Sequence, residues 1–517
     1  TMYQQKFHLY RNLTKPSERL YLSFAKAGAS GEAQNPSYLI NEIRKLFPEI
    51  PVRDIEKEEK PEEKLEMPRS GEALFLEELG RAAEGEIDPL FEELYRWYAA
   101  HPEAGIPAET YRKAAFLRCA DGVIGRSAAS ALYGDTLKNS ATRLEKYAAC
   151  AFAHFMEFGL QIRERDQYEL KAADMGTVMH EALEKFSKKL QENGETWKTV
   201  TDDTRDRLIE ECVEETMADY GNTIFQSSSR NQYRIIRVKR ILKRTVWALQ
   251  QQILQGEFEP GEFEVSFSME DSLSAINIDL SEHEKMRLRG RIDRVDLCET
   301  DDKVYVKIID YKTGNTSLDL VALYYGLQLQ LAVYLDAAVE LEQKKHPGKQ
   351  VEPAGVFYYH IDDPMLDQEE DETDEAWGRR MLKALRMDGL VNADRKVVEL
   401  LDRVLEDGTT SDVIPVGKKK DGSYTSYSKV ASPEQFDVIR TYTRKKVREI
   451  GAGIFSGNVK ISPYQRDGAT ACAYCEYQGI CGFDQKIQGY EYRKLKGMDT
   501  ELLMKAMQEI TQSDQKE

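Results

Sequence analysis

The chain has 517 residues and a formal net charge of −18 at pH 7, with 41% hydrophobic and 31% charged residues. This composition predicts an ordinary globular chain of roughly two to four domains, and it excludes transmembrane helices because no apolar run approaches the ~18 residues that one needs. The acidic balance argues against nucleic-acid binding by overall attraction but leaves room for a local basic channel, because salt screens surface charge beyond about 10 Å.

Four regions follow one another along the sequence. Residues 1–66 begin with mixed helical and strand-like patterns. From Arg53 the chain enters a charged, proline-containing segment, Arg53–Ser70, which is typical of a linker and crosses the boundary at residue 66. Residues 67–137 carry apolar residues at three- and four-residue spacing, which predicts a helical connecting region. We expect the main domain at 138–490 and a C-terminal helix or tail at 491–517. The first residues show no signal-peptide pattern, so we expect a cytoplasmic protein that does not contact membranes.

Within the main domain, helices precede strands. The periodicity predicts helices over 138–160, over 175–194 and within 203–255. Thr142 and Glu145 have the spacing of a capping box for the first of them. Strand patterns, a further helix and a returning strand follow, at residues 261–269, 285–298 and 304–312 (strands), 323–343 (helix) and 353–361 (strand). This order predicts an α/β fold with a mixed sheet flanked by helices.

Two neighbouring predicted strands carry charged residues where a buried strand would carry apolar ones. Asp293 lies on one strand, and Asp310 and Lys312 lie on the next. Residues two apart on a strand share a face, and neighbouring strands lie about 4.8 Å apart, so both carboxylates can reach one cation. Carboxylates suit Mg²⁺, and a nearby lysine can orient an attacking water or offset charge on a phosphate. Taken alone, the same residues also fit a hairpin with a partly exposed Asp–Lys pair.

Two further pairs lie four residues apart on predicted helices. His180 and Glu184 share one helix face, beside an apolar stripe, and Gln330 and Tyr334 share another. A lone histidine in such a place is more often structural, and the Gln330–Tyr334 pair by itself says little about function.

Taken in this order, the pieces resemble the RecB-like branch of the PD-(D/E)xK nuclease superfamily. The matching motifs are G-x-x-x-H-x-x-L-E (Gly176–Glu184), G-x-x-D ending at Asp293, D-x-K (Asp310–Lys312) and Q-x-x-x-Y (Gln330–Tyr334). The resemblance implies a restriction-endonuclease-like fold and hydrolysis of phosphodiester bonds with a divalent cation, Mg²⁺ or Mn²⁺.

The resemblance also implies a role for each matching residue. The implied cation ligands are His180, Asp293, Asp310 and the backbone carbonyl of Tyr311. Lys312 is implied to assist the attacking water, and Gln330 and Tyr334 are implied to line the phosphate path. Asp296 is an alternative ligand to Asp293, and because the two lie on opposite faces of a strand only one of them can face the metal.

Four cysteines are spaced as a metal or cluster site. Cys472, Cys475 and Cys481 form a C-x2-C-x5-C group, and Cys150 lies in the helical segment that precedes the nuclease motifs. RecB-like nucleases with an iron–sulfur cluster carry one cysteine and a later group of three in these places, so the resemblance implies a [4Fe-4S] cluster with a structural and DNA-positioning role. Ala151 stands where those nucleases have a proline, which is not a ligand. A Zn²⁺ ion on four thiolates and four free thiols are the alternatives.

The resemblance extends over most of residues 8–490 to the C-terminal portion of the AddB family, the second subunits of AddAB-type helicase–nucleases. Leu13–Gly28 is similar to the last part of the helicase-like core of that family, so residues 1–66 are expected to be a remnant of it. No G-x-x-x-x-G-K-[ST] pattern occurs, so no ATPase activity is expected from this chain.

The AddB resemblance implies a function and partners. It implies a DNA exonuclease, acting on the 5′-ended strand, in double-strand-break end processing for recombinational repair. The implied partners are DNA and a larger, AddA-like helicase–nuclease subunit. Two alternatives remain: a non-catalytic cluster-bearing scaffold that grips DNA or the partner, and a stand-alone RecB-like exonuclease.

Overall fold

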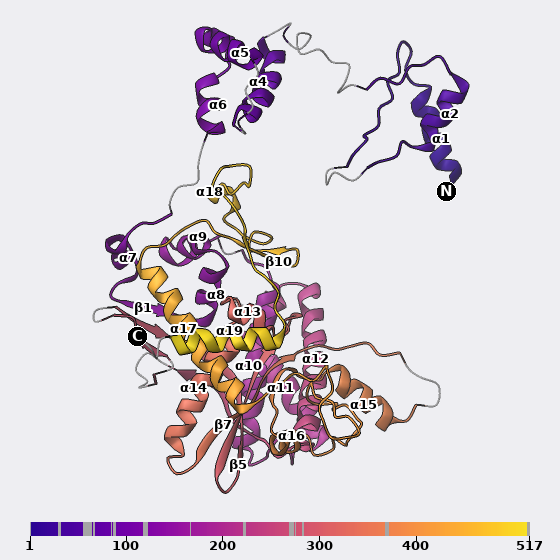
Figure 1. Ribbon diagram of the computed structural model, residues 1–517. Coiled ribbons are helices and arrows are strands. Elements are labelled where there is room, and N and C mark those ends of the chain that lie inside the picture. The colour runs from indigo at the N-terminus through magenta and orange to yellow at the C-terminus, as the bar shows by residue number, and fades with distance from the viewer. Residues whose placement is uncertain are drawn as a thin grey trace. The chain divides into compact units, whose positions relative to one another are not determined.

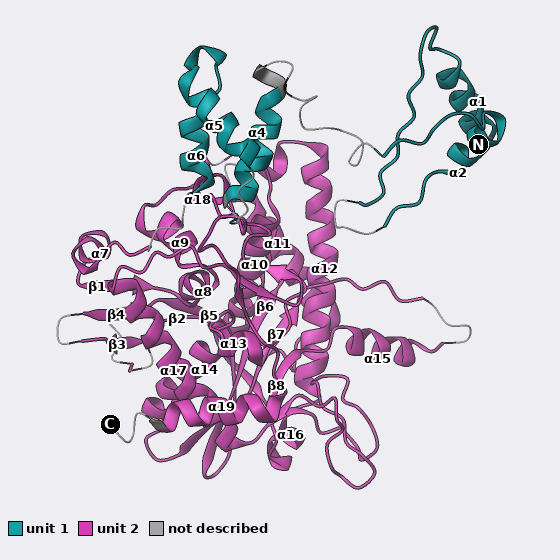
Figure 2. Ribbon diagram, turned by 45° about the horizontal axis from the view of Figure 1, so that its top comes forward, with its two compact units in different colours: residues 1–117 teal, residues 118–517 magenta. Residues whose placement is uncertain are grey.

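The computed structural model divides the chain into two compact units, residues 1–117 and 118–517 (Figure 2). The described residues are 2–28, 33–54, 65, 68–83, 85, 89–116, 122–165, 167–220, 224–267, 273–274, 276–281, 284–367 and 372–513. Most of the predicted linker Arg53–Ser70 lies outside them. The unit boundary falls between Leu117 and Arg118, and the predicted domain boundaries near residues 66, 137 and 490 remain predictions.

The first unit is helical over most of its described residues. Its small core is a cluster in which Phe75, Leu79 and Tyr98 are buried, and the rings of Phe75 and Tyr98 lie 5.3 Å apart. The helical segments are α1 (Met2–Leu13), α2 (Tyr38–Leu46), α4 (Pro68–Ala83), α5 (Pro89–Ala100), the 3₁₀ turn η2 (Pro102–Ala104) and α6 (Ala108–Ala115).

The second unit is built on a six-stranded sheet in the order β2-β5-β6-β7-β8-β9. Its strands are β2 (Glu259–Phe267), β5 (Gly290–Glu299), β6 (Lys303–Lys312), β7 (Gln350–His360), β8 (Asp388–Asn392) and β9 (Val430–Ala431). Strand β5 pairs antiparallel with β2 and β6, whereas β6 pairs parallel with β7. A parallel pair needs a crossover, which α14 (Gln330–Lys345) provides. The predicted mixed sheet is therefore confirmed.

Helices cover both faces of this sheet, because its central strands are apolar on both sides (Figure 1). On one face, Tyr305 and Ile309 of β6 pack in a core with α10, α11 and α12. On the other face, Val306 and Ile308 pack in a core with α8, α14, α17 and α19. These helices are α10 (Ala172–Glu192), α11 (Asp202–Asp219), α12 (Ser229–Leu254), α8 (Ala141–Ala149), α17 (Pro433–Phe455) and α19 (Thr500–Ser513).

Two three-stranded sheets accompany the main sheet. Their orders are β1 (Thr136–Asn139), β4 (Lys285–Leu288), β3 (Asn277–Asp279) and β11 (Ala469–Thr470), β10 (Tyr464–Arg466), β12 (Arg493–Lys494). The predicted strand 285–298 is thus divided between two sheets, and Arg289 marks the division. The remaining helical segments are α7 (Arg126–Tyr133), α9 (Ala151–His154), the π-helical turn η3 (Phe155–Gly159), the 3₁₀ turn η4 (Ile224–Gln226), α13 (Leu320–Tyr324), α15 (Asp374–Ala384), α16 (Arg395–Leu401) and α18 (Gln478–Cys481).

Two predicted helices are wrong in detail. The helix predicted over 138–160, with its entry at Ser140 or Thr142, does begin after Ser140, whose side chain caps it. It breaks at Cys150, where φ −163° and ψ 117° are extended. The Thr142–Glu145 capping box does not form, because Glu145 bonds to a different helix. The helix predicted over 323–343 is interrupted between α13 and α14, where Gly326 adopts φ +79°.

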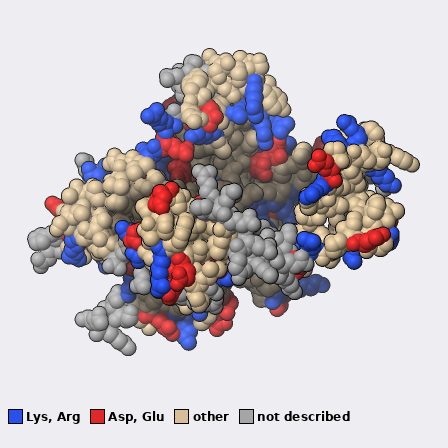
Figure 3. Space-filling model, turned by 90° about the horizontal axis from the view of Figure 1, so that it is seen from above, with Lys and Arg blue, Asp and Glu red and all other residues tan. Residues whose placement is uncertain are grey.

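The apolar character of the helices and the charges on the surface complete the description of the fold. None of the described helices combines the length and the apolar character needed to cross a membrane. Among the described residues on the face drawn in Figure 3, basic and acidic side chains are interspersed.

Candidate metal site and cysteine pocket

The antiparallel β5–β6 pair brings two carboxylates together. Arg294 lies opposite Ile309 in the register, so Asp293 and Asp310 come side by side at the next level of the hairpin. Both are buried, with exposed fractions of 7% and 2%. The backbone N–H of Tyr311 donates to Oδ2 of Asp293 at 2.7 Å, which ties this carboxylate to the neighbouring strand.

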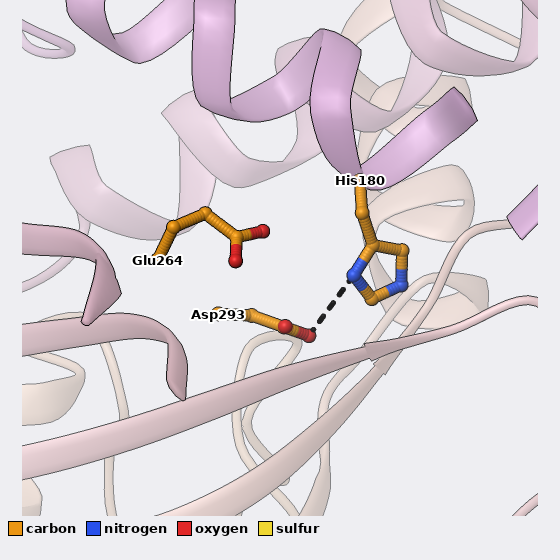
Figure 4. Close-up of side chains that lie close together, drawn as sticks. All are labelled: His180, Glu264 and Asp293. Carbon is orange, nitrogen blue, oxygen red and sulfur yellow. Dashed lines mark ion pairs between the residues drawn. The ribbon is translucent and has the colours of Figure 1, made fainter. Parts of the chain in front are cut away.

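His180 approaches the same carboxylate from helix α10 (Figure 4). Its Nδ1 lies 3.3 Å from Oδ2 of Asp293, and its ring stands edge-on to the ring of Tyr311 at a centroid distance of 5.8 Å. Burial disfavours the imidazolium form, but the hydrogen bond to Asp293 and the charges of Asp293, Asp310 and Glu264 outweigh burial. The pKa of His180 is therefore raised above its ordinary value.

Glu264 on β2 completes a group of three possible ligands (Figure 4). One ligand atom each from His180, Glu264 and Asp293 lies within 4.8 Å of the other two. Glu264 adopts φ +51°, a left-handed conformation that residues other than glycine seldom adopt. Its neighbours Phe263 and Val265 pack on opposite faces of the sheet, so the period-two alternation breaks at Glu264.

Negative charge accumulates around this group. The pKa of Glu264 is raised to about 7, chiefly by burial and next by the charge of Asp293, although Glu264 also forms an ion pair with Arg291. The pKa of Asp310 is raised to about 6 for the same two reasons, against the effect of Lys312. Two carboxyl groups with raised pKa values beside a third indicate a surplus of negative charge, which a divalent cation would relieve.

Lys312 and Gln330 form a hydrogen-bonded network around Asp310. Lys312 Nζ lies 2.6 Å from Oδ2 of Asp310 and donates to Oε1 of Gln330 at 3.0 Å. Gln330 Nε2 donates to Oδ1 of Asp310 at 2.9 Å and to the Tyr334 hydroxyl at 3.2 Å. Oδ1 of Asp310 therefore accepts a hydrogen bond, whereas its buried Oδ2 is in contact with Lys312 as an ion pair without a hydrogen bond. Asp310 is not one of the three convergent ligands. The predicted site residues nevertheless all lie in this one region.

Close packing accounts for the glycine of the G-x-x-D motif. A Cβ atom on Gly290 would lie 2.3 Å from the ring of Phe267 and 2.9 Å from the ring of Tyr334. Any side chain at Gly290 would displace Tyr334, whose hydroxyl accepts the bond from Gln330.

Asp296 lies on the opposite face of β5, away from the three-ligand group. Its carboxylate is bound by Arg294 Nε at 2.6 Å and by Lys307 Nζ at 2.7 Å, and all three residues are buried. The guanidinium of Arg294 also lies 5.3 Å from the ring centroid of Trp197. Burial alone would raise the pKa of Asp296, but the two cations outweigh burial and lower it. The geometry therefore gives Asp296 a structural position.

The four predicted cysteines line one pocket. Cys150 comes from the extended link between α8 and α9, and Cys472, Cys475 and Cys481 come from the segment that includes α18. None of the four takes part in a disulfide. Next to the pocket, the Tyr477 hydroxyl donates to the backbone oxygen of residue 162 at 2.9 Å and so ties the two segments together.

A [4Fe-4S] cluster and a single Zn²⁺ ion differ in the spacing that they require of the sulfur atoms. All four cysteines belong to the described part of the chain, and no three of their sulfur atoms lie within 4.8 Å of one another. A tetrahedral Zn²⁺ with bonds of about 2.3 Å would hold its sulfur atoms about 3.8 Å apart. A [4Fe-4S] cluster binds each thiolate to a different iron and holds the thiolates farther apart. Four cysteines that line one pocket are a donor set that both a cluster and a single ion can use, so the choice between the two stays a prediction.

Sequence reasoning missed two residues near the site. Glu264 stands in "GEFEVSF", where its alternation with Glu262 is typical of the solvent-facing side of a strand, and no motif includes it. Glu145 has the spacing of a local capping box but bonds to the backbone of Leu329 and Gln330. A positive φ and a long-range hydrogen bond leave no signal in a single sequence.

Comparison with known proteins points in the same direction as the geometry. The family model of the PD-(D/E)XK nuclease superfamily matches residues 138–482. The chain is 42% identical over 509 residues to a protein of Lachnoclostridium phytofermentans that is named as one of the subunits of an ATP-dependent helicase/deoxyribonuclease, covering 97% of this chain and 43% of the relative. It is 34% identical over 516 residues to the protein of the same name from Alkaliphilus metalliredigens, covering 99% and 45%. The chain thus spans less than half the length of these curated relatives.

Proposed function

The chain belongs to the PD-(D/E)XK nuclease superfamily, and from this premise we propose that it is a metal-dependent deoxyribonuclease. The proposed cation is Mg²⁺ or Mn²⁺. Its proposed ligands are His180, Glu264 and Asp293, with Asp310 and the backbone carbonyl of Tyr311 beside them. The observation that carries the proposal is the convergence of the first three ligand atoms within 4.8 Å, in a region of surplus negative charge.

The residues of the chain divide the chemistry between them. A bound divalent cation would polarise the scissile phosphate and lower the pKa of a water molecule. Lys312, held by Asp310 and Gln330, has further donor capacity with which it orients that water or offsets charge on the phosphate. Gln330 holds Lys312 and Asp310 relative to each other, because it bonds to both.

We propose a [4Fe-4S] cluster for the pocket of Cys150, Cys472, Cys475 and Cys481. The four cysteines that line one pocket and the resemblance to cluster-bearing nucleases support this assignment. Metal analysis and the visible absorption spectrum of anaerobically purified protein test it. Roughly four iron atoms per chain with a broad visible band support the cluster, whereas one zinc per chain without that band contradicts it.

The names of the relatives support a wider proposal for partners and role. We propose that the chain acts with a larger, AddA-like helicase–nuclease subunit in processing DNA double-strand ends for recombinational repair, in the cytoplasm. The sequence of the 517 residues contains no G-x-x-x-x-G-K-[ST] motif, so the proposed motor that delivers the strand lies outside these residues. The proposed substrate is the 5′-ended strand.

The decisive experiment is cleavage of linear duplex and single-stranded DNA, labelled on one strand at a time, by the whole chain and its Asp310→Ala variant. We expect degradation that depends on Mg²⁺ or Mn²⁺, stops with EDTA, and falls by about 10²–10³-fold in the variant, because Asp310 holds Lys312 and borders the cation site. Asp302→Ala, in the exposed turn of the same hairpin, is the matched control and should cleave as the unmodified chain does.

Two outcomes would contradict the proposal. Cleavage that is unchanged by Asp310→Ala would mean that the activity resides elsewhere. DNA binding without cleavage in either cation, by protein that is folded by circular dichroism, would favour the non-catalytic scaffold.

A further inference from the structure

Glu145 bonds to the first turn of the helix that carries Gln330. Its Oε1 accepts hydrogen bonds from the backbone N–H groups of Leu329 at 2.7 Å and Gln330 at 3.0 Å. Helix α14 has no cap of its own, because Leu329 stands at its N-cap position and forms no side-chain capping bond. Glu145, on α8, therefore supplies the cap from 184 residues earlier in the chain, and its carboxylate also suits the positive end of the helix dipole.

Packing holds α8 against the same turn. Gly326, just before α14, has φ +79°, and a Cβ atom on it would lie 3.1 Å from Cβ of Ala148 and 3.3 Å from Cδ1 of Ile450. These close approaches leave little room for the turn to move relative to α8. The backbone oxygen of Ala148 also accepts a hydrogen bond from Arg493, which follows the cysteine segment.

The turn that Glu145 holds positions a side chain of the candidate nuclease site. Gln330 is the first residue of α14, and its amide bonds to both Asp310 and Lys312. If the first turn of α14 loosens, this amide loses its fixed position between the carboxylate and the ammonium group. Glu145 makes no hydrogen bond to Asp310 or Lys312 in the described hydrogen-bond network, although its charge interacts with that of Lys312. The Glu145→Gln variant, which removes the charge and keeps the oxygen acceptor, separates this direct effect from the one that passes through Gln330.

We propose that Glu145 is a positioning residue of the nuclease site, which caps α14 so that Gln330 fixes Lys312 against Asp310. This inference rests on the proposed nuclease function. It assigns no contact between Glu145 and DNA or cation. Since α8 ends at Cys150, the helix that positions Gln330 is also the helix that leads into the cysteine pocket.

The test compares Glu145→Ala and Glu145→Gln with a matched capping variant. Asp319 caps the neighbouring helix α13 in the same way, since its Oδ1 accepts from the N–H groups of Val321 at 2.8 Å and Ala322 at 3.0 Å. Asp319→Ala therefore removes a cap, together with the ion pair between Asp319 and Arg466, from a helix that carries none of the site residues. The measurements are kcat and KM for DNA cleavage in saturating Mg²⁺ and the melting temperature of each variant.

We expect Glu145→Ala to lower kcat by roughly 10-fold to 100-fold, the range seen when an outer residue that orients a ligating group is lost, and to leave KM for DNA within about twofold. Glu145→Gln keeps an oxygen acceptor for both N–H groups and should restore most of kcat. Asp319→Ala should lower the melting temperature by a similar amount and leave kcat unchanged. An equal loss of kcat in Glu145→Ala and Asp319→Ala would overturn the inference, as would an unchanged kcat in Glu145→Ala.

A double-mutant comparison isolates the route through Gln330. If Glu145 acts by placing Gln330, then adding Glu145→Ala to Gln330→Ala should lower kcat by less than about twofold further. A full additional loss would overturn the inference. The nuclease proposal fails separately: in that case the unmodified chain shows no cation-dependent cleavage, and Asp310→Ala changes nothing.

Discussion

The two faces of the β5–β6 hairpin carry similar charged residues. The carboxylate on one face is neutralised by neighbouring cations, whereas the carboxylates on the other face are neutralised only in part. On one face, Asp296 is bound by two buried cations, Arg294 and Lys307, and its pKa is lowered. On the other face, Asp293 and Asp310 lie side by side with Lys312 as the neighbouring cation, and the pKa of Asp310 is raised to about 6.

This difference shows how one strand pair separates a structural role from a functional one. Buried charges that are paired and neutralised hold the sheet together but have no capacity left for a ligand. Buried carboxylates that are neutralised only in part lower the stability of the folded protein. A bound cation can neutralise the remaining charge. The balance of charge, rather than the residue types, therefore distinguishes Asp296 from Asp310, for which we propose a place beside the cation.

The largest expected change in stability comes from removing the carboxylate that neutralises the two buried cations. Asp296→Ala leaves Arg294 and Lys307 buried without their carboxylate, which should lower the free energy of unfolding by about 3–5 kcal/mol. Urea denaturation followed by circular dichroism measures this loss. Asp302→Ala, an exposed aspartate of the same hairpin, should change stability by no more than about 0.5 kcal/mol. A loss below about 1 kcal/mol for Asp296→Ala would contradict the structural role.

The second expected change in stability has the opposite sign and concerns Asp310, on the face where the carboxylates are neutralised only in part. The pKa of Asp310 is higher in the folded protein than in the unfolded chain. The free energy of unfolding of the wild type therefore falls as the pH rises from about 4 to about 6. Without divalent cations at pH 7, Asp310→Asn should therefore be more stable than the wild type by about 1–3 kcal/mol, and this advantage should vanish near pH 4. Thermal melts at several pH values measure it.

The same variant also reports on the cation. Added Mg²⁺ should raise the melting temperature of the wild type, because a ligand that binds only the folded state stabilises it. The rise should be smaller in Asp310→Asn. Equal rises in the two proteins would remove Asp310 from the cation site and leave its raised pKa without a functional meaning.

The smallest expected effect concerns Glu264. Glu264→Gln removes a charge from the three-ligand group and should weaken the apparent affinity for Mg²⁺ in cleavage assays by about tenfold, or about 1.4 kcal/mol. Glu262→Gln is the control on the same strand, because Glu262 pairs with Lys345 rather than with the site. If both variants need the same Mg²⁺ concentration as the wild type, Glu264 is not a ligand.

Much of the fold follows from periodicity and order in the sequence. The strand-like runs of β5 and β6, rich in β-branched residues, and the long amphipathic pattern of α10 are local signals, and the structure contains these elements close to the predicted bounds. The breaks at Cys150 and Gly326 were not predicted, because both are imposed by contacts with distant segments. Tertiary packing overrides helical propensity at such places.

The candidate site divides in a similar way. His180, Asp293, Asp310, Lys312 and Gln330 stand in ordered motifs and were identified through the resemblance that this order carries, and the structure places them together. Glu264 and Glu145 act through a left-handed backbone and through a long-range cap, which have no fixed spacing to the motifs. Nothing local in the sequence distinguishes them from the many other glutamates of an acidic chain.

The construction of the cysteine pocket sets an order of events during protein synthesis. Cys150 and Cys472 are 322 residues apart, and at roughly 5–20 residues per second the ribosome needs about 16–64 s to pass from one to the other. During that interval the nascent chain can complete strands β5 and β6 and helix α14, but not the pocket. Assembly of the proposed cluster is therefore expected to be a late maturation step on a domain whose candidate metal site has already been translated.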